Sequence, residues 1–260
     1  MEELGVIIFL LGLAVGSFLN VCIYRIPRKR SILRPFSYCP SCGKTIRFYD
    51  NVPLLSFILL KGKCRECKSR IPVRYPLVEL LTGVIFYSLY TTKGIGVESL
   101  VFMVLLCLLI VISFIDLEFQ IIPDLLSVGG MFAGFAFSFF RNPHFHLKDA
   151  IYGTLFGGGV LFIIAYIYEF LAKREGMGFG DVKLLAMIGS FLGVRGAIFS
   201  LISGAFFGTI LGIVLIAGYG KNLKYAIPFG PFLSLGAATF IFFGDTLTWF
   251  LIRTIFARGL

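Results

Sequence analysis

The sequence predicts an all-α polytopic membrane protein with about eight transmembrane helices and a small cysteine-rich cytoplasmic loop. Of the 260 residues, 58% are hydrophobic and only 15% are charged, and the mean hydropathy is +0.92. Water-soluble domains carry about 25% charged residues. In addition, several apolar stretches reach the roughly 20 residues that a helix needs to cross the hydrocarbon core of a bilayer. These observations exclude the class of water-soluble globular domains.

Apolar runs between charged or turn-forming residues define the expected spans, which are 4–24, 75–91, 97–115, 122–140, 149–171, 180–194, 196–219 and 229–256. The division at Arg195 is the least marked. A single helix over 180–219 would give seven spans and would move the C-terminus to the other side of the membrane.

The first span differs from a cleavable secretory signal. Its start is acidic, with Glu2 and Glu3, and the basic residues Arg25, Arg28 and Lys29 follow the apolar run. A secretory signal has the opposite polarity. We therefore expect a retained helix whose N-terminus lies outside.

Positive charge is concentrated in one loop. Residues 25–75 hold 13 of the 24 Lys and Arg residues, and their only acids are Asp50 and Glu66. A basic loop next to a span indicates the cytoplasmic side and anionic lipid head groups, so we expect no nucleic-acid partner. With eight spans, 18 basic residues are cytoplasmic, and the remaining six are Lys93, Arg141, Lys148, Arg195, Arg253 and Arg258. This bias supports the eight-span topology.

Two CxxC knuckles lie in the basic loop, formed by Cys39 with Cys42 and by Cys64 with Cys67. Four thiolates at this spacing can close a tetrahedral zinc site, which has a structural role because four protein ligands leave no open position. Two disulfides or redox-active pairs are the alternative. A cytosolic loop is kept reduced, however, and this disfavours structural disulfides.

Two aspartates lie at the ends of apolar spans, 65 residues apart. Asp116 closes the third span, and Asp181 opens the sixth, so both are expected at the cytoplasmic face. Acids at a membrane edge are costly and indicate function. Two close carboxylates share one proton, so one can act as general base and the other as general acid in hydrolysis.

The residues before Asp181 also need an explanation. An Asp at a helix start is a good cap, which is a structural reason for Asp181. That reason does not account for Gly178 and Gly180, which remove two side chains and permit positive φ. We expect these glycines to let an extended substrate chain approach the acid.

Other acids and histidines are weaker candidates. Asp124 is the main rival of Asp116, although Pro123 before it indicates the opening turn of the fourth span. Glu79 and Glu169 fall within spans and could support a site. His144 and His146 are expected to be a solvated pair rather than a metal site.

Six segments in this order resemble the type IV prepilin peptidases, which are GxGD-type aspartyl membrane proteases. They are residues 16–27 (GSFLNVCIYRIP), the two CxxC knuckles, residues 74–81 (RYPLVELL), Asp116 with residues 122–124 (IPD), residues 178–184 (GFGDVKL) and residues 227–232 (IPFGPF). The resemblance covers nearly the whole chain. It implies that Asp116 and Asp181 are the catalytic pair.

The resemblance also implies a biological role. The substrates would be type IV prepilins, or the pilin-like pseudopilins of type II secretion, cleaved after a glycine at the cytoplasmic face of the bacterial inner membrane. Members with the cysteine loop also methylate the new N-terminal amine with S-adenosylmethionine. Methylation rests on the resemblance alone, because the sequence offers no cofactor-binding residues of its own.

The expected organisation is a first helix (1–24), a basic loop with the knuckles (25–74) and a catalytic transmembrane region (75–260). Two other functions stay open. A proton-coupled transporter would place acids near the middle of the membrane and would use paired broken helices. A non-enzymatic assembly factor would use the cysteine loop for docking and the aspartates as helix-end residues.

Overall fold

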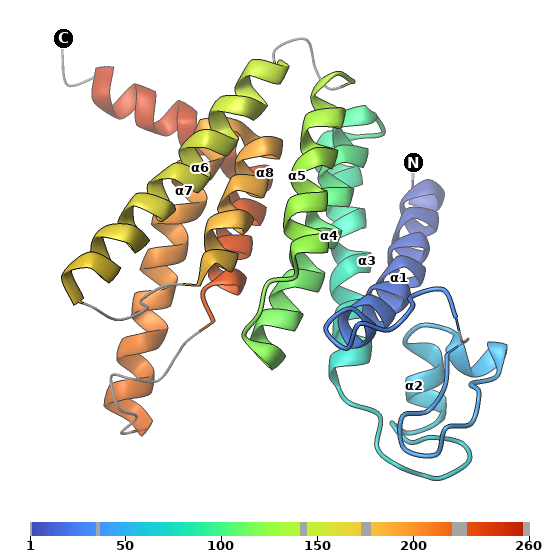
Figure 1. The fold of residues 1–260 in the computed structure, drawn as a ribbon. Helices are drawn as coiled ribbons and strands as arrows, with labels where there is room; N and C mark the ends of the chain where they lie inside the picture. Colours follow the sequence, from blue (N-terminus) through green and yellow to red (C-terminus); the bar gives the residue numbers. More distant parts are fainter. Residues whose placement is uncertain (1, 35–36, 141–144, 173–177, 220–227, 257–260) are drawn as a thin grey trace. The chain divides into compact units, whose positions relative to one another are not determined.

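A computed structural model describes residues 2–34, 37–140, 145–172, 178–219 and 228–256, and over these residues it is helical apart from two isolated β-bridges (Figure 1). The predicted all-α class is therefore confirmed. The chain forms two compact units, Met1–Val111 and Ile112–Leu260. They divide within α4 (Val97–Phe119).

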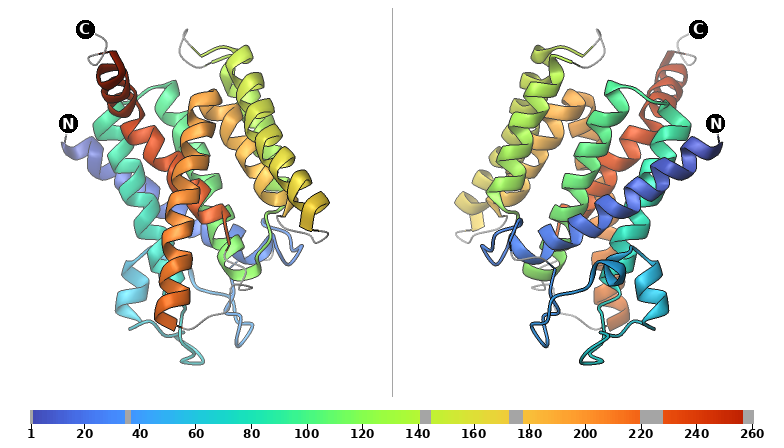
Figure 2. Two further views of the ribbon diagram at one scale, coloured as in Figure 1. Left: turned by 90° about the vertical axis from the view of Figure 1, so that its left-hand side faces the viewer. Right: turned by 90° about the vertical axis from the view of Figure 1, so that its right-hand side faces the viewer.

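The first unit is built on the pairing of α1 (Glu2–Arg25) with α3 (Arg74–Lys93), which lie side by side in Figures 1 and 2. Glycines allow the two backbones to approach closely. A Cβ at Gly12 would lie 2.8 Å from the Cα of Gly83, and one at Gly16 would lie 2.7 Å from the Cα of Glu79. Between these helices the chain forms η1 (Phe48–Asn51) and the short α2 (Leu55–Leu59).

The second unit is organised around α7 (Phe179–Tyr219), which packs against α5 (Asp124–Ser138), α6 (Leu147–Ala172) and α8 (Gly230–Phe256). Gly153 of α6 and Gly189 of α7 lie backbone against backbone, so that a Cβ on either residue would overlap the carbonyl group of the other. Gly157 also faces the Leu185 carbonyl. The glycines of α6 therefore serve close helix contact, as residues of this kind do in membrane bundles.

A break divides α7 at Gly193, whose φ of 68° and ψ of −172° are not helical. The predicted division at Arg195 lies two residues further on. The half before the break contacts α6 and also α5, where Gly134 meets Ser190. The half after the break contacts α8, because a Cβ at Gly204 would lie 3.2 Å from a methyl carbon of Leu233. One long helix thus has different partners on the two sides of one glycine.

Four helices of the described chain are long and apolar enough to cross a membrane, over Glu3–Arg25, Val97–Phe119, Leu147–Leu171 and Phe179–Leu215. Two shorter apolar helices cover Asp124–Ser138 and Gly230–Gly244. These helices are typical of an integral membrane protein. The length and composition of the described helices support a helical membrane protein and do not by themselves establish eight spans.

The end of α4 differs from the prediction. Asp116 was expected to close this helix, but α4 continues to Phe119. The helix ends where Gln120 adopts a positive φ of 54° and donates its backbone N–H to the Asp116 carbonyl over 2.8 Å. A left-handed residue after the last turn is a common helix stop. Asp116 therefore lies inside the last turn and not beyond it.

Some predicted features fall outside the described residues. They include His144, Ile227, and the basic residues Arg141, Lys173, Arg174, Lys221, Lys224 and Arg258.

The contact between Gly153 and Gly189 can be tested by Gly189→Ala. The added methyl group would overlap the Gly153 carbonyl, and overpacking of this kind costs about 1–3 kcal/mol. The melting temperature of the purified protein in detergent should fall by about 2–4 °C for each kcal/mol lost. Gly159→Ala is the matched control, because nothing lies within 4 Å of the position of its methyl group. Equal melting temperatures for the two variants would contradict the close contact.

Candidate functional site

The four knuckle cysteines form one cluster in the first unit. The sulfur atoms of Cys39, Cys42, Cys64 and Cys67 all lie within 4.8 Å of one another, and the Sγ atoms of Cys39 and Cys67 are 3.8 Å apart. A tetrahedral site with Zn–S bonds of 2.3 Å has sulfur–sulfur distances of about 3.8 Å. All four thiols are free, so the cluster fits a metal ion and contains no disulfide.

The two knuckles have the same backbone geometry. Cys39 and Cys64 each donate a backbone N–H to the carbonyl five residues ahead, at Lys44 and Ser69, over 2.9 and 2.8 Å. The residue after the second cysteine of each knuckle has positive φ, 70° at Gly43 and 59° at Lys68. Each knuckle is therefore a tight turn that aims two sulfur atoms at a common point.

Hydrogen bonds favour the thiolate form at Cys39 and Cys67, whereas burial and the neighbouring thiols Cys39 and Cys67 raise the pKa of Cys42 to about 11. Burial by itself would raise the pKa of Cys39, but the amides of Cys42 and Ser41 and the hydroxyl of Ser69 lower its pKa to about 6. The side chain and the backbone of Ser69 also lower the pKa of Cys67. Metal ions bind the thiolate and not the thiol, so these contacts prepare the cluster for a metal ion.

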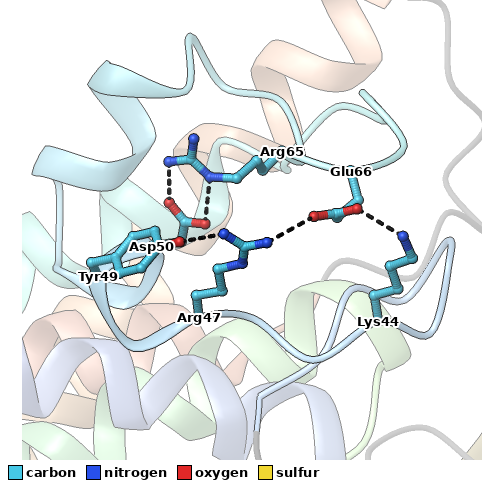
Figure 3. Close-up of polar contacts among 6 residues, drawn as sticks. All are labelled: Lys44, Arg47, Tyr49, Asp50, Arg65 and Glu66. Atoms are coloured by element: carbon cyan, nitrogen blue, oxygen red, sulfur yellow. Dashed lines mark hydrogen bonds and ion pairs between the residues drawn. The ribbon is translucent and has the colours of Figure 1, made fainter.

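Ion pairs join the two halves of the cysteine loop (Figure 3). Arg65 donates two hydrogen bonds to Asp50, over 2.8 and 2.6 Å. Glu66 pairs with Lys44 over 2.7 Å and with Arg47 over 3.8 Å. Solvent and salt screen the more exposed pairs of Glu66. The Arg65–Asp50 pair is less screened, because it is bidentate and the Asp50 side chain is only 8% exposed.

Asp116 and Asp181 come together in the second unit. Asp116 lies in the last turn of α4, and its side chain is buried, with 5% exposure. Its Oδ2 atom accepts the backbone N–H of Gly230, the first residue of α8, over 3.0 Å. Asp181 lies in the first turn of α7, directly after Gly180, and Ile122 packs against both Gly180 and Gly230. The fold therefore joins two acids that are 65 residues apart in the sequence.

Of the two glycines before Asp181, Gly180 has a packing role in the folded chain. Neither Gly178 nor Gly180 has positive φ. Gly180 instead makes room for Ile122, because a Cβ at this position would lie 3.0 Å from the Cβ of Ile122. A Cβ at Gly230 would lie 3.4 Å from the Cδ1 of the same isoleucine. Ile122 thus packs against the starts of both α7 and α8, beside the two acids.

The remaining acids lie elsewhere. Asp124 opens α5 as predicted, and its exposed carboxylate pairs with Lys183 over 2.6 Å. Glu79, which the sequence could not place, is buried and accepts the backbone N–H of Leu54 over 2.8 Å. Because Leu54 has a positive φ of 58°, this bond holds a strained turn against α3. Glu169 is exposed.

Gly230 is the site residue that the sequence did not single out. Residues 227–232 were interpreted only as the entry to the last helix. Pro231 marks the first turn of a helix, and this pattern would have located an N-terminus with free amide groups. No sequence pattern indicates that Asp116, 114 residues earlier, is the group that accepts one of these amides.

The first unit also contains a cleft of about 320 Å³. Its lining includes Ser17, Phe18, Arg25, Ser37 and Asn51. Among the described residues that line it, Arg25 is the charged one.

Comparison with known proteins supports the arrangement in two parts. The profile of the bacterial peptidase A24 N-terminal domain matches residues 10–93. The profile of the type IV leader peptidase family matches residues 103–213. These matches include the cysteine cluster and both aspartates, respectively.

Individual relatives match over most of the chain. A protein of Aeromonas salmonicida named prepilin leader peptidase/N-methyltransferase is 34% identical over 96% of this chain and 94% of its own length. A Pseudomonas putida protein of the same name is 32% identical over 91% of this chain and 90% of its own length. A Myxococcus xanthus relative, also of this name, is 41% identical, and the match covers 84% of this chain but only 64% of that protein. No solved structure matches this chain.

Proposed function

The chain belongs to the type IV leader peptidase family, and on this premise we propose that Asp116 and Asp181 are its catalytic pair. The reaction is removal of the leader peptide from prepilins, the substrates that the names of its relatives give. The observation that carries the proposal is that one isoleucine, Ile122, packs against both Gly180, next to Asp181, and Gly230, which is hydrogen-bonded to Asp116. The two acids come from the ends of different helices.

The chemistry follows from this proximity. Two carboxyl groups that interact strongly in a poorly solvated site hold one proton between them. One group then takes a proton from water while the other donates a proton to the scissile carbonyl oxygen. A peptide bond can be hydrolysed in this way without a covalent intermediate.

The proposed location of the site is the cytoplasmic edge of the bacterial inner membrane. The excess of Lys and Arg in residues 25–75 supports a cytoplasmic cysteine loop under the positive-inside rule. Eight spans would place both acids on the same side as this loop. The break at Gly193 supports the eight-span topology, because it divides α7 into two helical segments.

The competing functions fit less well. A transporter that uses intramembrane acids places them along a path at mid-membrane depth, whereas Asp116 and Asp181 lie in terminal turns of their helices. An assembly factor has no need of two interacting acids, and it would not require Gly230 and Gly180 to be free of side chains beside them. The peptidase proposal accounts for both features.

We also propose that the cysteine cluster holds zinc. The sulfur separation of 3.8 Å between Cys39 and Cys67 supports a tetrahedral thiolate site. Four ligands leave no open position, so the ion would fix the fold of the loop and take no part in hydrolysis. N-methylation of the new N-terminus comes from the names of the relatives, and we derive no step for its methyl donor.

Zinc binding is tested by metal analysis of the purified protein. We expect about one zinc ion per chain. Cys39→Ser and Cys67→Ser should lose the metal, because each removes one of the four thiolates. Cys107→Ser, in α4, is the matched control and should retain it. Metal-free protein with oxidised cysteines would contradict both the site and the cytoplasmic position of the loop.

The catalytic pair is tested by Asp116→Asn and Asp181→Asn, with leader removal from a prepilin followed in liposomes. Each variant should lose about 10²-fold to 10⁴-fold in cleavage rate, because each lacks one acid–base group. Asp124→Asn is the control and should cleave at close to the wild-type rate. An unchanged melting temperature in detergent would show that the inactive variants are folded. Full activity in either variant would move the catalytic role to another acid.

A further inference from the structure

We infer that the Gly230 amide at the start of α8 makes Asp116 the ionised general base of the pair and leaves the shared proton, and the role of general acid, to Asp181. This inference rests on the proposed function and assigns separate roles within it. It identifies Gly230 as a positioning residue that acts through Asp116.

The contact on Asp116 is a charge-assisted hydrogen bond in a buried setting. The Gly230 N–H donates to Oδ2 over 3.0 Å, and amide groups in the first turn of a helix have no partner within that helix. A hydrogen bond to the charged form favours ionisation, and it is stronger where water is excluded. Asp116 therefore satisfies a free amide of α8 best as a carboxylate.

Asp181 has no comparable donor. No side-chain hydrogen bond joins its carboxyl group to the residues that the structure describes, and Asp181 is half-buried. Partial removal from water and a negative charge on Asp116 would both oppose a second negative charge. Asp181 can keep the proton that Asp116 gives up, and the protonated form is the one a general acid needs.

Helix dipoles act against this assignment but are the weaker effect. Asp116 lies at the C-terminal end of α4, where negative charge is disfavoured, and Asp181 lies at the N-terminal end of α7, where it is favoured. A direct hydrogen bond to a charged group contributes more than a helix-end dipole without one. The Gly230 contact therefore decides which acid is ionised.

Other charged groups do not change this balance. On α4, Glu118 lies two residues beyond Asp116 and points to a more exposed surface. Asp124 of α5 and Lys183 of α7 neutralise each other in their ion pair. Among the described residues, the acids left to set the charge at the site are Asp116 and Asp181.

Glycine at position 230 lets the Asp116 carboxylate lie against the backbone amide without moving aside. A Cβ there would lie 2.7 Å from Oδ2 of Asp116, closer than a carbon and an oxygen can pack. Ile122 confines the same space from the other side, at 3.4 Å. A larger residue would push the Asp116 carboxylate away from the amide.

The reaction then has a defined order. Asp116 takes a proton from water as the water oxygen bonds to the scissile carbon, and Asp181 gives its proton to the carbonyl oxygen. Asp116 next passes its proton to the amide nitrogen as the carbon–nitrogen bond breaks. Asp181 recovers a proton from the diol hydroxyl. One water is consumed, and the two acids return to their starting states.

The test is the pH dependence of cleavage by the full-length protein in liposomes with Gly230→Ala. Loss of the hydrogen bond should move the acidic limb of kcat/KM to higher pH by about one unit, with a corresponding fall of about tenfold in kcat/KM on that limb. KM should change little. Gly129→Ala in α5 is the matched control, because nothing lies within 4 Å of the position of its methyl group.

A second variant keeps the test valid if Gly230→Ala fails to fold. Replacing Gly230 by glycolic acid, an α-hydroxy acid, turns the preceding peptide bond into an ester. The backbone N–H is lost, and no side chain is added. This replacement should shift the acidic limb in the same direction. An unchanged pH profile in a folded form of either variant would overturn the assignment. If the pH profile is unchanged but Asp116→Asn is inactive, the proposed catalytic pair stands and only the assignment of separate roles fails. If Asp116→Asn is active, the proposed pair itself is wrong.

Discussion

The hydrogen bond between the Gly230 amide and the Asp116 carboxylate is the interaction on which the second unit depends. A charge at the edge of a membrane helix is costly unless a polar group compensates it. Here the compensation comes from the first amide of α8, which itself lacks a partner within its helix. Two groups that are each unfavourable alone satisfy each other. The same bond fixes the start of α8 beside the end of α4.

Glycines, which have no side chain, allow the helix backbones to approach one another closely. Gly230 leaves room for Asp116, Gly180 leaves room for Ile122, and Gly153 and Gly189 let α6 and α7 touch. In lipid, where apolar surface gains little from burial against other apolar surface, such close approach is a main source of helix association. Glycine in this chain therefore serves packing more than flexibility. Gly193, with its positive φ, is the exception within the helices of the second unit.

Patterns local in sequence predicted much of the fold. Apolar runs located the helices because the bilayer sets their length, and cysteine spacing identified a cluster whose sulfur atoms do converge. The two aspartates stood out because charge is rare at the ends of such helices. Local patterns also explain the errors. The third span was predicted to end at Asp116 because this residue is charged. The helix instead ends at Phe119, where the next residue, Gln120, adopts a positive φ.

Long-range contacts could not be predicted from one sequence. Gly180 packs against Ile122, and nothing near Gly180 in the sequence indicates this contact. Gly230 was overlooked for the same reason, since its partner lies 114 residues away. A single sequence shows that a glycine is present, and only the folded chain shows which atom needs the room.

The break at Gly193 divides α7 into two helical segments joined at a kink. The segment that carries Asp181 is clamped by α5 and α6, while the other segment holds the start of α8, and with it Gly230. The bend at this residue thus lets one helix pack against α5 and α6 near Asp181 and against the start of α8 near Gly230.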